Sequence, residues 1–377
     1  MRFDLTEEQA FFSETTRKFI QSRGALTATR DRWERPEGFD LPYWREAAEL
    51  GWAAAFVPED LGGGSVSGRP VQDAAIVAEE MGRMVAPGPF LAVNVVAAAI
   101  AEQGTAAQRA EWLPGIVSGE MVGSWAVEED GATWSGTLPT VSATAEVERG
   151  ELVLNGAKAY VEAAGQADLF LVTARTGGAL SQLLLPADTP GLTVTPGRSI
   201  DLSRRFGRLH LDGVRLPASA VLGTPGEGTG AVERQLQIAL ALQCAETVGA
   251  AQQAFEVTID YARDRFAFGR PIASFQALKH RIADMLQWIE FGKAISEAAA
   301  EAVDEGSEDA ARLVSVAKAY VGDRCLDVVD ECVQISGGIG VTWEHDVHLY
   351  SRRIALNRAL FGSPEQHKER LCQLLER

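Results

Sequence analysis

The sequence predicts an α+β fold with an N-terminal helical domain, a central β-barrel or β-sandwich and a C-terminal helical bundle. Three observations predict it: helical spacing of apolar residues near the N-terminus, short alternating runs divided by prolines in the middle, and long proline-free stretches toward the C-terminus. Helices and strands are segregated along the chain rather than alternating, which argues against a doubly wound parallel sheet. We place the three domains at residues 1–122, 123–227 and 228–377.

The first segment opens with a helix-start pattern. Thr6 and Gln9 have the spacing of a capping box, in which each side chain binds the backbone N–H of the other residue. Apolar residues then recur at helical spacing, among them Phe12, Phe19 and Ile20. No apolar core of a secretory signal precedes this helix, so we expect a cytoplasmic protein.

The second segment changes to strand-like alternation. In ELVLNGAKAYV, Leu152 and Leu154 alternate with other residues, and Asn155 and Gly156 then supply a pair suited to the positive φ angles of a type I′ hairpin turn. Further short apolar runs follow, punctuated by prolines from Pro186 onward. These features predict a small antiparallel barrel or sandwich.

Two long helices are predicted for the third segment. The stretches Ala231–Arg265 and Ser274–Val303 are rich in alanine and contain no proline. Helices of this length usually pack side by side as a bundle. We therefore expect a C-terminal bundle that extends into contacts between chains.

Charge and composition exclude several classes of protein. The 377 residues carry a formal net charge of −17, which repels nucleic acid, so we expect no nucleic-acid partner. No apolar run of about 18 residues is present, so we expect no membrane span. The four cysteines form no C-x-x-C pair, which favours reduced thiols over a disulfide framework. His345 and His348 lack the further ligands that a zinc site requires, so no metal is expected.

Three glycines lie close together in QISGGIGVTWEHD, Gln334 to Asp346. A Rossmann fingerprint starting at Gly338 would need a third glycine where Trp343 stands, and a strand rather than a helix before it. Gly337 or Gly338 is instead suited to end the preceding helix. Two interpretations stay open: a helix C-cap alone, or a C-cap whose N–H groups also bind a phosphate.

A second stretch, YARDRFAFGRPIASFQALKHRIADM from Tyr261 to Met285, changes the balance between these interpretations. Together with the Q-x-x-G-G-x-G pattern that begins at Gln334, it resembles the acyl-CoA dehydrogenase family of flavoproteins. The helix–strand–helix order and PEDLGG at Pro58 to Gly63 match as well. The resemblance implies an acyl-CoA dehydrogenase-like fold, FAD as the cofactor and an acyl-CoA thioester as the substrate.

The resemblance also implies which residues hold the flavin. Arg265 would meet the FAD pyrophosphate, for which a guanidinium offers bidentate hydrogen bonds. Phe268, Phe275 and Gln276 would line the flavin or its adenosine side. A third set matches the loop that reaches the same FAD from a neighbouring subunit: Gln334, Ile335, Gly337 and Gly338.

The strand segment departs from the family pattern. Where members show T-E-P-x-A-G-S-D, this chain has SWAVEEDGATWSG, from Ser124 to Gly136. Glu129 is kept, the proline becomes Asp130, and the G-S-D end is lost. Tyr160-Val161-Glu162 stands where members show W-I-T. The flavin site formed by this chain alone is therefore predicted to be altered.

The usual catalytic base is absent from both positions where family members carry it. Phe361 stands at the glutamate position near the C-terminus, and Ala239 stands at the alternative position on the long helix. Glu246, seven residues after Ala239, is a candidate on roughly the same helical face. The alternative interpretation of Glu246 is a buried glutamate paired with an arginine.

These residues imply one main function and two alternatives. The main one is FAD-dependent α,β-dehydrogenation of an acyl-CoA, with electron-transfer flavoprotein or a similar acceptor as partner. The chain would act in a dimer or tetramer, including as one subunit of a heteromeric enzyme. The alternatives are a non-catalytic partner subunit that keeps the fold for assembly, and a flavin monooxygenase on the same fold.

Overall fold

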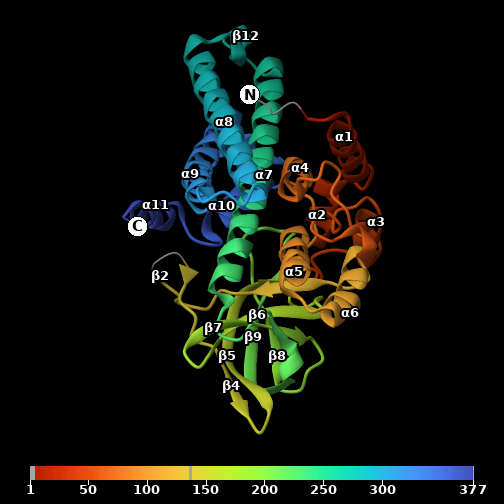
Figure 1. The fold of residues 1–377 in the computed structure, drawn as a ribbon. Coiled ribbons are helices and arrows are strands. Elements are labelled where there is room, and N and C mark those ends of the chain that lie inside the picture. The colour runs from red at the N-terminus through yellow and green to blue at the C-terminus, as the bar shows by residue number, and fades with distance from the viewer. Residues whose placement is uncertain (1–4, 136–137, 377) are drawn as a thin grey trace.

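The computed structural model describes residues 5–135 and 138–376 (Figure 1). The predicted order of helices, strands and helices is confirmed. The outermost residues of the first and last predicted domains, 1–4 and 377, lie outside the described part, as does Gly136 at the end of the strand motif. The sheet lies at one end of the molecule, and the α7–α8 helix pair extends to the other end.

The N-terminal part is helical, with bounds α1 Glu7–Ser22, α2 Ala25–Arg32, α3 Leu41–Glu49, α4 Pro70–Met84, α5 Phe90–Gln103 and α6 Ala106–Val117. The capping box is confirmed, because Gln9 N donates to Thr6 Oγ1 and Thr6 N donates to Gln9 Oε1, both at 3.2 Å. Residues from Phe90 to Ile100 of α5 are all buried, which places this helix in the core.

The central strands form one mixed sheet in the order β10-β7-β6-β4-β5-β9-β8. Their bounds are β1 Gly123–Ala126, β4 Thr144–Glu148, β5 Glu151–Glu162, β6 Leu169–Thr176, β7 Ala179–Pro186, β8 Leu192–Pro196, β9 Phe206–Pro217 and β10 Val221–Leu222. A short pair, β2 Trp134–Ser135 and β3 Leu138–Pro139, lies apart. The expectation of purely antiparallel strands is wrong for β1 and β4, which run parallel to β6. The hairpin of β4 and β5 lies between β1 and β6 in the sequence, and such a crossover permits parallel pairing.

The predicted turn at Asn155-Gly156 is also wrong. Both residues lie inside β5, at a shift in its register with β9. The turn between β4 and β5 is Arg149-Gly150, with φ of 53° and 87°, which gives the positive angles that a type I′ turn needs. Gly156 instead permits a close approach, because a Cβ there would lie 2.9 Å from Ala143.

The C-terminal part is the predicted bundle, and its elements are α7 Gly228–Asp264, β11 Phe266–Ala267, β12 Arg270–Pro271, α8 Gln276–Asp304, α9 Ala310–Ser336, the 3-10 helix η4 Gly337–Val341, α10 Val347–Ala359 and α11 Pro364–Leu375. The helix α7 passes through the middle of the molecule and packs against α4, α5, α8, α9 and α10. Gly82 on α4 and Gly249 on α7 let these two helices pack closely, since a Cβ at either would overlap the other helix's backbone. The helix α7 thus contacts the N-terminal helices, strand β7 of the sheet and the other C-terminal helices, so it can position residues from all three parts of the chain.

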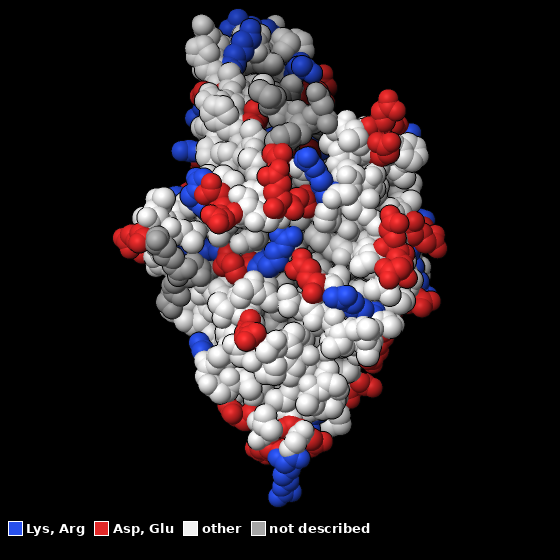
Figure 2. All heavy atoms as spheres, viewed as in Figure 1, with Lys and Arg blue, Asp and Glu red and all other residues white. Residues whose placement is uncertain are grey.

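Charged side chains cover much of the surface (Figure 2). On the face shown, acidic and basic groups lie side by side over the middle of the molecule, and the surface over the sheet is mostly uncharged. In the part of the chain that the structure describes, no helix is both long and apolar enough to cross a bilayer.

Candidate active site

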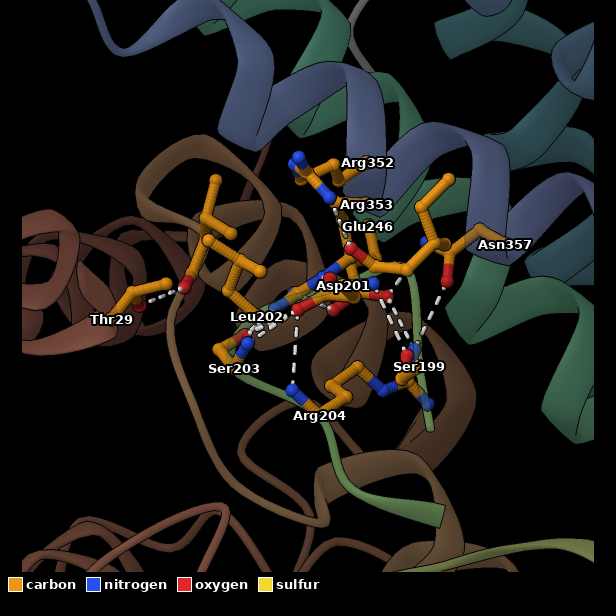
Figure 3. Close-up of polar contacts among 12 residues, drawn as sticks. Thr29, Ser199, Asp201, Leu202, Ser203, Arg204, Glu246, Arg352, Arg353 and Asn357 are labelled. Carbon is orange, nitrogen blue, oxygen red and sulfur yellow. Dashed lines mark hydrogen bonds and ion pairs between the residues drawn. The ribbon is translucent and has the colours of Figure 1, made fainter. Parts of the chain in front are cut away.

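Glu246 lies in a buried cluster of ionic side chains between the sheet and the C-terminal bundle (Figure 3). One carboxylate oxygen, Oε1, accepts a hydrogen bond from Arg353 Nη1 at 2.6 Å. The other, Oε2, accepts from Asn357 Nδ2 at 2.8 Å and from Arg204 Nη1 at 3.3 Å. Both oxygens are thus engaged by donors. These contacts favour the structural interpretation of Glu246 over a free proton acceptor.

Two more carboxylates complete the cluster. Asp201, in the β8–β9 connection, pairs with Arg353 Nε and accepts from Ser203 N at 2.7 Å. Glu162, at the end of β5, accepts from Arg204 Nε at 2.5 Å. Burial alone would raise the pKa of Asp201, but the Arg353 guanidinium outweighs it and the pKa is lowered. The Asp201 carboxylate therefore stays ionised, and the ion pairs of the cluster tie β5, the β8–β9 connection, α7 and α10 together.

The cluster leaves little room for a ligand. Two cavities beside it, lined in part by Glu162 and Arg204, have volumes of only about 10 Å³ each. Such a space holds about one water molecule. Arg204 itself is buried, since only 4% of the residue is exposed.

The two positions where the resemblance places the catalytic base, 239 and 361, hold buried apolar side chains. Ala239 on α7 is fully buried, and Phe361 lies in the short connection between α10 and α11 with 8% exposure. The Phe361 ring packs on Trp125 of β1, with 5.3 Å between centroids. The backbone of Phe361 has a φ of 58°, which a bulky residue adopts rarely.

Buried side chains hold this α10–α11 connection in place. Lys318 of α9 donates to the carbonyl of Leu360 at 2.8 Å and also to Asn357 O and Gln243 Oε1. His367 Nε2 lies 2.8 Å from the Phe361 carbonyl, so Nε2 carries the donated proton. Burial and, next, the charge of Lys318 lower the pKa of His367 to about 3, which keeps the ring neutral.

The predicted flavin residues of the first set lie at the far end of the α7–α8 pair. Arg265 ends α7, its side chain is exposed, and no ion pair involves it within the described residues. Phe268 and Gly269 form the turn between β11 and β12, with φ of 54° and 79°. Phe268 is 95% exposed and contacts Phe275 edge-on at 6.2 Å, and Gln276 is exposed at the start of α8.

The second predicted set lies where α9 ends. Gly337 is the C-cap residue of α9 with φ of 62°, as expected for a helix-ending glycine, although its ψ of −140° lies outside the left-handed helical region. Gln334, Gly337 and Gly338 are exposed, whereas Ile335 is buried. No atom lies within 4 Å of a Cβ built on either glycine. The backbone here can therefore approach a ligand closely.

Together the two sets fit a dinucleotide such as FAD. Arg265 and Arg270 offer guanidiniums for phosphate, and the glycines offer unobstructed backbone. Phe275 already carries the Arg270 guanidinium over its ring at 4.0 Å, so the aromatic surface lies next to cations. Within the described residues, no hydrogen bond, ion pair or ring contact joins the Arg265 set to the Gln334 set. This arrangement suits a site completed by a second chain.

The sequence left the partners of Glu246 unidentified. Arg353 and Asn357 lie four residues apart, so they share one face of α10, and both are buried. The spacing of Arg353 and Asn357 could indicate a polar face on this helix, but it does not identify Glu246 as the residue which that face contacts. Among the described residues, no three His, Cys, Asp or Glu side chains gather as metal ligands.

Comparisons with known proteins agree along nearly the whole chain. Models of the acyl-CoA dehydrogenase N-terminal, middle and C-terminal domains match residues 6–120, 126–214 and 226–375. The mitochondrial isobutyryl-CoA dehydrogenase of Dictyostelium discoideum is 30% identical over 370 residues, covering 95% of this chain and 87% of that protein. Among solved structures, butyryl-CoA dehydrogenase from Megasphaera elsdenii has a TM-score of 0.92 at 25% identity, covering 100% of both chains. A chain of the ChsE4-ChsE5 complex from Mycobacterium tuberculosis has a TM-score of 0.88 at 26% identity, covering 100% of this chain and 99% of that one.

Proposed function

This chain belongs to the acyl-CoA dehydrogenase family, and from that premise we propose that it shares an FAD with a partner chain and serves the α,β-dehydrogenation of an acyl-CoA thioester. The observation that carries the proposal is the pair of exposed flavin-type surfaces at Arg265 and at Gly337–Gly338. Members of the family are FAD-dependent. The acyl chain of the substrate is left open.

Named residues of this chain would hold the flavin. Arg265 would bind a phosphate by charge-assisted hydrogen bonds, while Phe268 and Phe275 would contact a planar ring. The backbone at Gly337 and Gly338 would approach the adenosine-pyrophosphate part of an FAD that belongs to the other chain's Arg265 set. When bound, the flavin supplies the acceptor for the hydride that leaves the β-carbon of the thioester.

The proton at the α-carbon needs a separate acceptor. Phe361 and Ala239 cannot accept a proton, and the contacts of Glu246 hold it in an ion cluster. The base therefore comes either from a partner subunit or from another carboxylate of this chain. The first possibility would make the chain a non-catalytic partner subunit, and the second would make it the catalytic one.

We propose that the chain works in a heteromeric assembly, whichever subunit supplies the base. The similarity to a chain of the two-component ChsE4-ChsE5 complex supports this proposal. Exposed apolar side chains at the end of the bundle support contact with another chain, and they include Phe266, Phe268, Ile339, Val341 and Trp343. Electron-transfer flavoprotein is the proposed acceptor for the electrons, and the cytoplasm is the proposed compartment.

The test is to purify the chain alone and after co-expression with a second acyl-CoA dehydrogenase homologue, and to record the flavin spectrum of each. We expect flavin to be retained in the co-expressed assembly and to be bleached by a saturated acyl-CoA without oxygen. Assemblies that never bind flavin, or that bleach with no acyl-CoA tested, would contradict the proposal. Turnover that requires oxygen would instead favour a monooxygenase.

A pair of arginine variants tests the flavin surface. Arg265→Ala should weaken FAD binding at least about 10-fold, since a charge-assisted hydrogen bond is worth about 1.5–3 kcal/mol. Arg263→Ala is the matched control, because Arg263 is exposed two residues earlier and pairs with Asp260. Equal FAD affinity in both variants would show that Arg265 is an ordinary surface residue.

A further inference from the structure

A cavity of about 360 Å³ lies between helices α1, α4, α7 and α8. Figure 1 shows α4 between α1 and the α7–α8 pair, and α4 packs against all three of these helices. On α4 the cavity is lined by Ala75, Ile76 and Glu79, whereas the small cavity beside Glu246 is lined by Ala78 and Met81. The two spaces therefore lie on different faces of α4. Cavities of about 300–1,000 Å³ are the size of small-molecule sites.

The cavity has an apolar end and a solvent-facing end. Its apolar side chains come mainly from α4, α7 and α8, and they include Ala75, Ile76, Ala245, Val248 and Ala300. The residues from α7 and Ala300 are buried, which places the deep end beside them. Leu5 and Arg69, which also line the cavity, are exposed and place its mouth between the start of α1 and the loop before α4. A short hydrocarbon group would gain free energy by leaving water for the deep end.

The charged groups in the wall are engaged by the protein itself. Lys293 and Arg69 each pair with a glutamate of α8, at 2.7 and 3.6 Å. Glu79 and Glu297 also have interactions within the protein. Two cations and two carboxylates thus line the described part of the wall, and their charges balance. The cavity therefore favours an uncharged ligand over an ion.

A buried hydroxyl in the wall has no partner. Ser296 of α8 lines the cavity and is 6% exposed, and within the described residues its Oγ forms no hydrogen bond. Other buried hydroxyls on helices of the bundle donate to the carbonyl four residues earlier, as Thr258 and Ser336 do at 2.8 Å. Burying a hydroxyl without a partner costs folding free energy. A ligand that accepts a hydrogen bond from Ser296 would remove this cost.

A second unused donor comes from α4. The backbone N–H of Gln72 donates to Asp304 at 2.9 Å, whereas its side-chain Nε2 is buried and forms no hydrogen bond with the described residues. Gln72 lines the same cavity as Ser296. An amide nitrogen can only donate, and a hydroxyl can donate as well as accept. Together these two groups suit a ligand that presents an acceptor oxygen, such as a carbonyl.

We propose that this cavity binds an uncharged amphipathic molecule. Ser296 and Gln72 donate hydrogen bonds to its carbonyl oxygen, and a short hydrocarbon part of the molecule fills the apolar end. The cavity wall shares no residue with the flavin surfaces at Arg265 and at Gly337–Gly338, nor with the Glu246 cluster. The site is therefore independent of the acyl-CoA chemistry proposed above.

Hexanamide is the probe, because it carries an uncharged amide on a short hydrocarbon chain. Its binding to the full-length chain is measured by titration calorimetry, beside hexanoate and hexylammonium, which keep the chain length and add a charge. We expect saturable binding of hexanamide, at least about 10-fold tighter than that of either ion, since a charge costs more to remove from water than an amide. The absence of saturable hexanamide binding overturns the inference, as does binding of an ion as tight as that of hexanamide.

Two variants place the probe in the cavity. Ala75→Met should weaken hexanamide binding at least about 10-fold, because the longer side chain takes the space of about two methylene groups of the probe. Ala294→Met is its matched control, since Ala294 is also half-buried on a helix but is not part of the described cavity wall. Ser296→Ala should weaken binding about 2- to 10-fold, the range of a neutral hydrogen bond, and Ser351→Ala on α10 is its control. Unchanged affinity in either Ala75→Met or Ser296→Ala overturns the inference.

A photoreactive hexanamide that carries a diazirine locates the site without any substitution. Mass spectrometry of the irradiated full-length chain should find the label on peptides that contain Ala75 or Ser296, and excess hexanamide should suppress it. Label confined to other segments overturns the inference, even if the variants fail to fold. Flavin content and bleaching by acyl-CoA are not measured here, so failure of this site leaves the proposed function to its own test.

Discussion

At the scale of single residues, the ease with which a buried carboxylate ionises depends on how many hydrogen-bond donors reach it. Glu246 receives two guanidiniums and an amide, and Glu129 receives an ammonium and two backbone N–H groups. A buried carboxylate with several donors costs less to ionise than one with few. Both glutamates are therefore held in structural pairs.

Glu246→Gln should destabilise the chain by about 3–5 kcal/mol, because it leaves Arg353 and Arg204 buried without their shared anion. Urea unfolding at neutral pH measures this change. Asp260→Asn is the control on the same helix, since Asp260 is exposed and pairs with Arg263 three residues away. An unfolding free energy for Glu246→Gln as high as that of the control would show that the carboxylate contributes no net stability.

At the scale of elements, the α10–α11 connection is held by buried side chains that donate hydrogen bonds to its carbonyls. Lys318 supplies protons to carbonyls at the end of α10, and His367 supplies one to the carbonyl of Phe361. Gly362, with a φ of 93°, lies directly over the His367 ring, where a Cβ would meet Nε2 at 2.9 Å. The connection thus depends on a neutral, closely packed imidazole.

This imidazole predicts a pH dependence of stability. Its pKa falls from an ordinary 6.5 to about 3 in the folded chain, first because of burial, so between these values the unfolded chain binds the extra proton. The unfolding free energy should therefore drop as pH falls below 6.5, by up to about 1.4 kcal/mol per pH unit from this group. Urea titrations between pH 7.5 and about 5 measure the slope.

The slope should be shallower in His367→Gln, which keeps a donor for the Phe361 carbonyl but cannot titrate. His210→Gln, at an exposed histidine of β9, controls for the loss of a histidine elsewhere. The acidic groups are the same in the unaltered chain, His367→Gln and His210→Gln. The difference in pH slope between the two variants therefore reports the contribution of His367. Identical slopes in the two variants would contradict a buried, neutral His367.

At the scale of the whole molecule, the α7–α8 pair extends from the rest of the chain and ends in exposed aromatic and basic residues (Figure 1). Phe291 on α8 is 51% exposed and Leu286 is 43% exposed. Exposed apolar groups gathered in this way mark surfaces that pack against another chain. We therefore place the proposed partner contact on the bundle.

Phe291→Glu should shift the assembly toward lower mass in analytical ultracentrifugation, because it places a charge in the proposed contact between bundles. Val147→Glu is the matched change at the other end, since Val147 on β4 is 66% exposed and lies on the sheet. We expect the mass of that variant to match the unaltered protein. A change of mass in Val147→Glu alone would place the interface on the sheet instead.

The sequence by itself determined those features that depend on neighbouring residues. Its periodicity gave the order of helices, strands and helices, the Thr6–Gln9 pair marked the first helix, and the glycine at 337 marked the end of α9. Local patterns suffice here because capping and helix termination involve groups within a few residues of one another. The same patterns misplaced a turn at Asn155-Gly156. Gly156 lies inside β5, where the absence of a side chain lets the strand approach Ala143 closely.

Only the tertiary structure decided what each carboxylate meets. Arg353 reaches Glu246 across 107 positions of sequence, and Lys158 reaches Glu129 across 29. Periodicity places a residue on a face of its own element, but it does not say which distant side chain that face will meet. Burial and long-range pairing set the protonation state of a carboxylate, so the chemistry of these glutamates was fixed by packing between elements rather than by their local sequence.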